Sequence, residues 1–325
     1  IFFVLIFLIS ILPIVEIGQN SAETITSTVK WSGVKEIDTD VIIKSGAILT
    51  IADDTIVNLN SDVSFSVEGS LIIEGVGDSG VQFIANISQQ SELGSKSNWE
   101  GIILENSGVA EINGLSLNGT RNGIKANLGS NLEINNSTIS DSIQGVLNYG
   151  TAELKDFTCI NIQNNCITNA GSMNADMIFS NHTGQLLSHN NTGTFTELSA
   201  NNTGVVVEVS GGATGVLNTL NTVNTGLVLR AYGDQSGMTY SEIESEYSSQ
   251  LFDVSNSEAL SLNNIQGVSI NSVLLANSVD SLEINSMYIY DSNSVGLAME
   301  ISTSDSVKIS NATINGYGQS FLFSG

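Results

Sequence analysis

The sequence predicts an all-β protein folded as a single right-handed parallel β-helix (β-solenoid) of about a dozen coils, each 19–25 residues long. Three observations predict this fold. Similar short phrases of polar and aliphatic residues recur along most of the chain. The polar residues are mainly Ser, Thr, Asn and Gly rather than charged residues. The 325 residues include a single proline, Pro13.

The repeat is clearest in the middle of the chain. The phrases "AEINGLSLNG" (110–119), "NLEINNSTIS" (131–140) and "AELKDFTCIN" (152–161) start 21 residues apart, which aligns Ile112, Ile134 and Leu154. A second apolar phrase recurs between these copies. We align it on one position per copy: Gly123, Gly145, Cys166, Gln185, Gly204 and Gly226. Two strand-like phrases per period describe one coil, which acquires a core only when its neighbours stack on it.

The composition agrees with stacked strands and turns. Hydrophobic residues make up 41% of the chain and charged residues 13%, and the abundant Ser, Thr, Asn and Gly favour turns over helix interiors. No proline follows Pro13, as expected if neighbouring strands use nearly every backbone N–H. The leucine-rich-repeat pattern is absent, and a β-sandwich would not keep a period over two hundred residues.

Three regions are distinguished along the chain. Residues 1–22 begin with the apolar run "IFFVLIFLISILPIV", which predicts a signal peptide that lacks its N-terminal part; an uncleaved anchor is the alternative. Residues 23–101 are interpreted as N-terminal capping coils. Residues 102–325 are interpreted as the repeat region, which we expect to continue because no polar cap ends it. The predicted location is therefore extracellular or at the cell surface.

The N-terminal coils carry a resemblance to a known family. The triplet Trp31-Ser32-Gly33 is echoed by Trp99-Glu100-Gly101, and "SGAILTIADDTIV" (45–57) and "VEGSLIIEG" (67–75) lie between them. These motifs resemble the right-handed parallel β-helix repeat proteins of exported microbial surfaces, within the pectin-lyase-like superfamily in the broad sense. The resemblance implies the fold but no single activity, because such proteins include lyases, hydrolases and adhesins.

The charge balance limits the partners. The chain has 33 acidic and 9 basic residues, a net charge of −24. Such a surface repels nucleic acid and anionic membrane surfaces. The sequence also lacks a Gly-rich phosphate loop and a nucleophile elbow. The expected partners are extracellular glycans or surface proteins.

A row of acidic residues is the candidate metal site. In "YSEIESEY" (240–247) Glu242, Glu244 and Glu246 occupy alternate positions, and Asp234 lies shortly upstream. Alternate residues of a strand face the same side about 6.8 Å apart, and calcium binds several carboxylate oxygens. The alternatives are a calcium site between this row and a neighbouring coil, or a solvated acidic stripe.

Two tyrosines are the candidate binding residues. The register of "SLEINSMYIY" (281–290) places Ile289 in the core and points Tyr288 and Tyr290 outward. Outward tyrosines on a flat sheet stack against sugar rings or against another protein. The alternative is that they lie beneath a loop.

Histidine and cysteine give weaker signals. His182 and His189 do not form a known metal motif, so we expect two surface loop residues. Cys159 and Cys166 lie seven residues apart, and the sequence leaves open a disulfide or two buried thiols.

The leading functional prediction is a non-catalytic, exported cell-surface or adhesion-type scaffold that binds glycans or proteins. The alternative is a carbohydrate-active enzyme, either a polysaccharide lyase or a glycoside hydrolase. The resemblance implies that a lyase would use a basic residue beside carboxylates, but no such cluster is evident beside Arg121 or Lys125. It implies paired aspartates for a hydrolase, and Asp53-Asp54 is explained by a turn. No catalytic residue is assigned, and calcium is the one cofactor considered.

Overall fold

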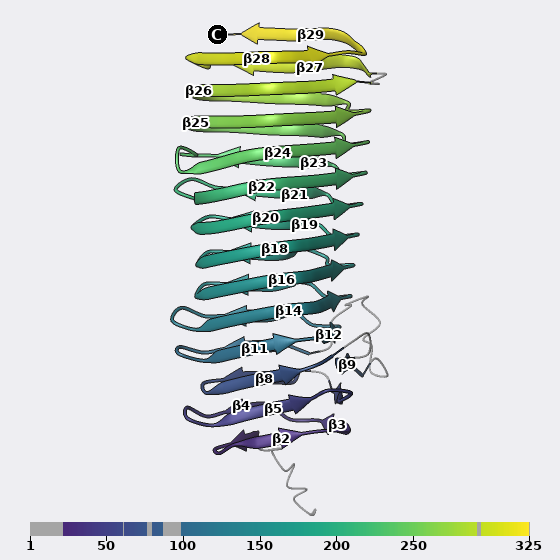
Figure 1. Ribbon diagram of the computed structural model, residues 1–325, viewed down its shortest axis with the longest axis vertical. Coiled ribbons are helices and arrows are strands. Elements are labelled where there is room, and N and C mark those ends of the chain that lie inside the picture. Colours follow the sequence, from purple (N-terminus) through teal and green to yellow (C-terminus); the bar gives the residue numbers. More distant parts are fainter. Residues whose placement is uncertain (1–21, 61, 77–79, 87–98, 291–293, 325) are drawn as a thin grey trace, which may run out of the picture.

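The computed structural model describes residues 22–60, 62–76, 80–86, 99–290 and 294–324. Within these residues every strand belongs to one continuous 29-stranded sheet, and the paired strands all run parallel. The sheet winds into a column of about 13 coils (Figure 1). The predicted all-β, right-handed parallel β-helix is confirmed. No helix among the described residues is long and apolar enough to cross a bilayer.

The first four coils contain three short strands each, and each strand pairs with the strand three places further along the chain. These strands are β1 (Glu23–Ile25), β2 (Val29–Trp31), β3 (Val34–Ile37), β4 (Val41–Ile43), β5 (Ile48–Ala52), β6 (Ile56–Leu59), β7 (Ser64–Val67), β8 (Ser70–Glu74), β9 (Val81–Ala85), β10 (Gly101–Leu104), β11 (Val109–Asn113) and β12 (Leu115–Asn118).

The following coils combine a short strand with a longer one. The strands are β13 (Ile124–Ala126), β14 (Asn131–Ser140), β15 (Val146–Asn148), β16 (Thr151–Ile160), β17 (Asn165–Asn169), β18 (Ser172–Asn181), β19 (Gln185–His189), β20 (Thr192–Asn201), β21 (Val205–Val209), β22 (Thr214–Val223), β23 (Leu227–Tyr232) and β24 (Met238–Glu246).

In the last coils the strands lengthen or merge, and the sheet continues without a break in pairing. The strands are β25 (Gln250–Val268), β26 (Ser272–Tyr290), β27 (Ser294–Ser302), β28 (Ser306–Ile314) and β29 (Tyr317–Ser324). The predicted boundary at residue 101 is not marked by an interruption of the stack. The predicted signal peptide or anchor at 1–22 lies almost entirely outside the described residues.

The predicted register of the first phrase is confirmed. Ile112 pairs with Ile134, and Ile134 pairs with Leu154. All three side chains are buried, because equivalent residues of successive coils fill one interior column.

The predicted register of the second phrase is wrong from its fourth member onward. Cys166 is equivalent to Leu186, not to Gln185, because Ile167 pairs with Leu187. Gly204 follows Gly184 instead, and a Cβ atom on Gly204 would lie 2.7 Å from the Gly184 carbonyl oxygen. The sequence alignment fails here because two consecutive residues are buried in this strand, so the strict inward-outward alternation is lost.

The longer strands bend at their sixth residue, which we call the corner. Asn136, Asp156 and Met177 occupy this position with φ of 46°, 50° and 52°. Asn and Asp visit this left-handed region more readily than most residues. The bend turns the last residues of each strand onto a second face of the coil, so the corner runs along the column.

The N-terminal core is aromatic. Trp31 packs edge-on against Phe65 with ring centroids 6.0 Å apart, and Phe83 lies 5.2 Å from Phe65 and 6.0 Å from Trp99. The Trp99 indole N–H donates to the Asn118 carbonyl at 3.0 Å. The repeated Trp-x-Gly motif therefore supplies large side chains to one shared core.

A polar ladder lies inside the middle coils. The Asn148 amide donates to Asn169 Oδ1 at 2.8 Å, and Asn169 Nδ2 lies 3.1 Å from His189 Nδ1. All three residues are buried, with His189 only 1% exposed. The prediction that His189 is a surface loop residue is therefore wrong: this residue caps a buried amide ladder.

Cys159 and Cys166 form a disulfide, with their Cα atoms 5.8 Å apart. Both residues are buried, and they join the end of β16 to the start of β17 across the interior of one coil. The structure thus decides a choice that spacing alone left open.

Candidate functional site

A groove on the corner of the C-terminal coils brings together predicted residues from two separate phrases. It has a volume of about 440 Å³. We call it the corner groove, and it is lined by Glu242, Glu244, Asn264, Ile265, Gln266, Ser286 and Tyr288.

Three successive coils build the corner groove. Glu244 of β24 pairs with Gln266 of β25, and Gln266 pairs with Tyr288 of β26, so these three side chains form one outward column. Neighbouring members are about 4.8 Å apart. The corner positions Glu242 and Asn264 begin the adjacent column. The groove therefore presents a ladder of carboxylate, amide and aromatic groups along the column axis.

The two predicted tyrosines are exposed. The rings of Tyr288 and Tyr290 lie 5.3 Å apart at 49°, and the residues are 51% and 40% exposed. Ile289 between them is fully buried, as predicted from the register. The outward placement inferred from sequence is thus correct, and Tyr288 forms one wall of the groove.

The two carboxylates of the groove are not neutralised by nearby cations. None of the ion pairs within the described residues involves Glu242 or Glu244. Both residues are exposed, and Ile243 between them is buried. The carboxylate oxygens are therefore available to accept hydrogen bonds from a ligand.

The four residues predicted to bind calcium are not gathered in one place. Asp234 lies in the turn before β24, where it accepts a hydrogen bond from the Ser236 backbone N–H at 2.8 Å. Hydrogen bonds from Ser236 lower the pKa of this carboxyl group. Glu246 ends the strand and lies outside the groove lining. Among the described residues, no three His, Cys, Asp or Glu side chains converge enough to hold one metal ion.

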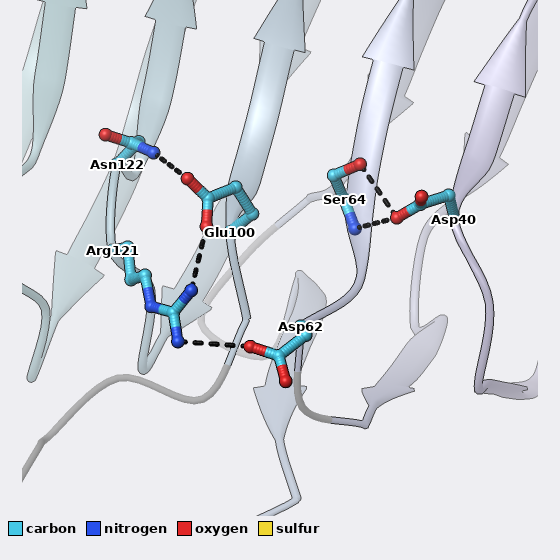
Figure 2. A network of polar contacts seen from close by, with 6 residues as sticks. All are labelled: Asp40, Asp62, Ser64, Glu100, Arg121 and Asn122. Carbon is cyan, nitrogen blue, oxygen red and sulfur yellow. Dashed lines mark hydrogen bonds and ion pairs between the residues drawn. The ribbon is translucent and has the colours of Figure 1, made fainter.

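A second polar cluster surrounds Arg121 in the N-terminal coils (Figure 2). The guanidinium group lies between Asp62, at 3.0 Å, and Glu100, at 3.3 Å. Glu100 also accepts a hydrogen bond of 2.6 Å from the Asn122 amide. In the coil below, Asp40 accepts hydrogen bonds from the backbone N–H and the hydroxyl of Ser64, at 2.8 and 2.9 Å.

The expectation that no carboxylates lie beside Arg121 is therefore wrong. Sequence reasoning missed Asp62 because it is 59 residues away and reaches Arg121 only through the winding of the coils. A guanidinium group paired on both sides is not a free base. Lys125 also lies elsewhere, with its amino nitrogen 5.9 Å from the Tyr149 ring centroid. The structure thus gives no support to a lyase site on these two residues.

The Asp53-Asp54 pair is part of a turn, as predicted. Asp54 adopts φ of 57°, and Asp53 accepts a hydrogen bond of 2.7 Å from the Val76 backbone N–H. These hydrogen bonds shape the coil and leave no reason to assign a catalytic role to the pair.

Sequence reasoning also missed the middle of the corner groove. Asn264 and Gln266 attracted no attention because isolated amides are common in this chain. The signal was nevertheless present: Glu244, Gln266 and Tyr288 are each 22 residues apart, which is one coil. Searching the coil period for chemically distinct residues in one column would have found the site.

Comparison with known proteins shows similarity in structure only. No protein-family model and no curated protein matches the chain. The solved catalytic domain of Agl-KA is similar with a TM-score of 0.50 and 12% identity, over 85% of this chain and 63% of that chain.

Catalytic domains of a GH87 α-1,3-glucanase are more distant. The complex of a D1069A variant with tetrasaccharides has a TM-score of 0.44 and 14% identity, over 86% of this chain and 64% of that chain. The complex with nigerose has a TM-score of 0.41 and 13% identity, over 87% and 64%. The chain thus spans less than two thirds of each of these structures. The shared architecture is the right-handed parallel β-helix of pectin-lyase-like type.

These comparisons correct the leading functional prediction. The chain was expected to be a non-catalytic adhesion scaffold, but the solved β-helices that it resembles are catalytic domains. The prediction of a non-catalytic scaffold is therefore wrong, and the alternative of a carbohydrate-active enzyme replaces it as the hypothesis to develop.

Proposed function

We propose that this β-helix is a glycoside hydrolase that binds a neutral glycan in the corner groove. One observation carries the proposal: two unpaired carboxylates, Glu242 and Glu244, share a groove with an amide column and the exposed ring of Tyr288. The catalytic domain of Agl-KA supports it through a similar fold.

The groove chemistry suits a neutral sugar. The apolar face of a pyranose ring packs on a tyrosine ring, and its hydroxyl groups donate to carboxylates and amides. The net charge of −24 opposes binding of anionic uronate polymers. A neutral polymer escapes this repulsion, so we propose neutral glucans as the substrate class.

Hydrolysis needs one carboxyl group as an acid and one as a base. The acid protonates the glycosidic oxygen as its bond to the anomeric carbon breaks. The base removes a proton from the water that attacks this carbon. Alternate residues of a strand lie about 6.8 Å apart, and inverting hydrolases space their carboxyl groups about 6.5–9.5 Å apart. We therefore propose that Glu242 and Glu244 form an inverting pair.

The test is release of reducing sugar from neutral glucans, with α-1,3-, α-1,4- and β-1,4-linked polymers compared. Loss of an acid or base lowers the rate by about 10²–10⁴-fold. We expect a fall of this size for Glu242→Gln and for Glu244→Gln. Glu258→Gln is the matched control, because Glu258 is an exposed glutamate of β25 outside the groove.

Two outcomes would contradict the proposal. If the wild-type protein releases no reducing ends from any neutral glucan, it is not a hydrolase of this class. If turnover survives both glutamine variants, the corner groove is not its active site. Analysis of the product anomer tests the stereochemistry, because an inverting pair must yield the opposite anomeric configuration.

We also propose that the protein acts outside the cell, as the apolar residues 1–15 led us to expect. The disulfide between Cys159 and Cys166 supports this, since such bonds persist in oxidising compartments. Alkylation of the protein in its native cells, followed by mass spectrometry, should find both cysteines oxidised. Two alkylated thiols would contradict an extracellular location.

A further inference from the structure

A second groove lies over the turns that lead into β14, β16, β18 and β20. It has a volume of about 560 Å³ and spans four coils. We call it the turn groove. It lies on earlier coils than the corner groove and shares no lining residue with it.

The floor of the turn groove is backbone. A Cβ atom on Gly150 would lie 2.5 Å from the Ser130 carbonyl oxygen, and one on Gly171 would lie 2.2 Å from the Gly150 carbonyl oxygen. Stacking of the coils therefore excludes side chains from these two positions. The same requirement keeps the groove open, since no larger residue can fill it.

One wall of the turn groove is a row of hydrogen-bonding side chains. Asn131, Thr151, Ser172 and Thr192 pair in register across four coils, and all four are exposed. The coil spacing places one such group about every 4.8 Å along the column. A linear ligand lying along the column axis would meet a polar group at each coil.

The opposite wall is apolar. Leu128 is 78% exposed and Tyr149 is 40% exposed, which is unusual for large hydrophobic residues that follow one another in neighbouring coils. An aromatic ring facing a row of hydroxyls matches the two sides of a sugar, whose ring face is apolar and whose rim carries hydroxyls.

The charge of the turn groove selects an uncharged ligand. None of its lining residues is acidic, although the chain contains 33 acidic residues. The groove therefore lacks the carboxylates that a cation or a basic peptide would require. The overall charge of −24 opposes polyanions, and the single nearby cation, Lys125, is held against the Tyr149 ring.

We propose that the turn groove is a non-catalytic binding site for a neutral linear polysaccharide that lies along the column, stacked on Tyr149 and hydrogen-bonded to the hydroxyl row. The site shares its ligand class with the proposed function but does not require hydrolysis. It would hold a long polymer on the same rod that carries the corner groove.

The experiment titrates maltohexaose and cellohexaose into the protein by calorimetry. A Tyr288→Ala, Glu242→Gln background silences the corner groove and prevents turnover. In this background we expect binding of at least one hexaose to persist. Adding Tyr149→Ala should weaken that binding at least tenfold, and Thr151→Val should weaken it to a smaller degree. Adding Tyr247→Ala should leave it unchanged, because Tyr247 is 58% exposed and lies in neither groove.

Each outcome decides between the two proposals. Binding that vanishes in the background, or that survives Tyr149→Ala, overturns the turn groove while leaving the hydrolase intact. Tyr149-dependent binding without any hydrolysis by the wild type supports the turn groove and removes the hydrolase. Tighter binding of hexagalacturonate than of both neutral hexaoses would overturn the assigned ligand class. Circular dichroism of each variant confirms that the fold is retained.

Discussion

His189 shows how one residue can make the fold sensitive to acid. Its Nδ1 accepts from the Asn169 amide, which places the ring proton on Nε2, 3.4 Å from the Thr214 carbonyl oxygen. Burial lowers the pKa of His189 below its usual value of 6.5. A protonated ring would turn the amide contact into a clash of two donors, so the folded protein requires the neutral form.

The pH dependence of stability follows from this lowered pKa. Above pH 6.5 the ring is neutral in both the folded and the unfolded chain, so it contributes its full stability there. As the pH falls below this value, the unfolded chain takes up a proton that the folded chain resists, and the stability is lost progressively. We expect the urea midpoint of the wild type to fall as the pH is lowered from 7.5 to about 5.5.

Two variants isolate the origin of this effect. His189→Val should flatten the pH dependence between pH 7.5 and about 5.5, since the next coil already places Val209 in this column. His182→Asn should retain the wild-type dependence, because His182 is exposed and Asn tolerates its φ of 54°. Equal slopes for the wild type and His189→Val would show that other groups control the acid sensitivity.

At the scale of the strand and turn, close stacking of coils dictates which turns must carry glycine. Gly171 meets the carbonyl oxygen of Gly150, whereas Gly212 has φ of 81° and no atom within 4 Å of its Cβ position. The first glycine is required by packing and the second by backbone conformation alone. These two causes should have different energetic costs.

Alanine substitutions separate the two causes. Gly171→Ala forces neighbouring coils apart, and overpacking of this kind costs about 1–3 kcal/mol or more. Gly212→Ala places a Cβ in the left-handed region at a cost of about 1 kcal/mol. Urea unfolding should therefore show the larger loss for Gly171→Ala. A smaller loss at Gly171 than at Gly212 would contradict the close stacking of these turns.

Strand register was largely predictable from the sequence, and its failures are informative. The columns of Ile112 and Leu117 follow from period-two alternation and a 21-residue repeat, and the structure confirms both. The second phrase breaks this alternation, because Cys166 and Ile167 are both buried. No local pattern distinguishes such a doublet from an ordinary strand, so the alignment slipped there.

For the molecule as a whole, stacking converts sequence repeats into columns of like charge. Glu111 pairs with Glu133, and Glu133 pairs with Glu153, so three exposed carboxylates lie on adjacent coils. Like charges directly opposite on paired strands destabilise a sheet. The total charge of −24 adds a longer-range repulsion across the column.

Salt should therefore stabilise this protein. Raising the NaCl concentration from 0.01 to 0.15 M shortens the screening length from about 30 to 8 Å, and we expect the melting temperature to rise. Glu133→Gln should raise the stability by about 0.2–1 kcal/mol at low salt, and by less at high salt. Glu74→Gln is the contrasting variant, because Glu74 is paired with Lys30 at 3.1 Å and its loss should not stabilise. A melting temperature independent of salt would contradict this account.

The sequence by itself determined the all-β class, the parallel β-helix, the first-phrase columns and the outward direction of Tyr288 and Tyr290. These features depend on residue spacing along the chain, and spacing can be read without coordinates. The tertiary structure decided the disulfide, the burial of His189, the pairing of Arg121 with Asp62, and the meeting of Glu242 and Glu244 with Tyr288 in one groove. These features depend on which residues of different coils become neighbours. That neighbourhood is set by the small changes in coil length that accumulate as the chain winds.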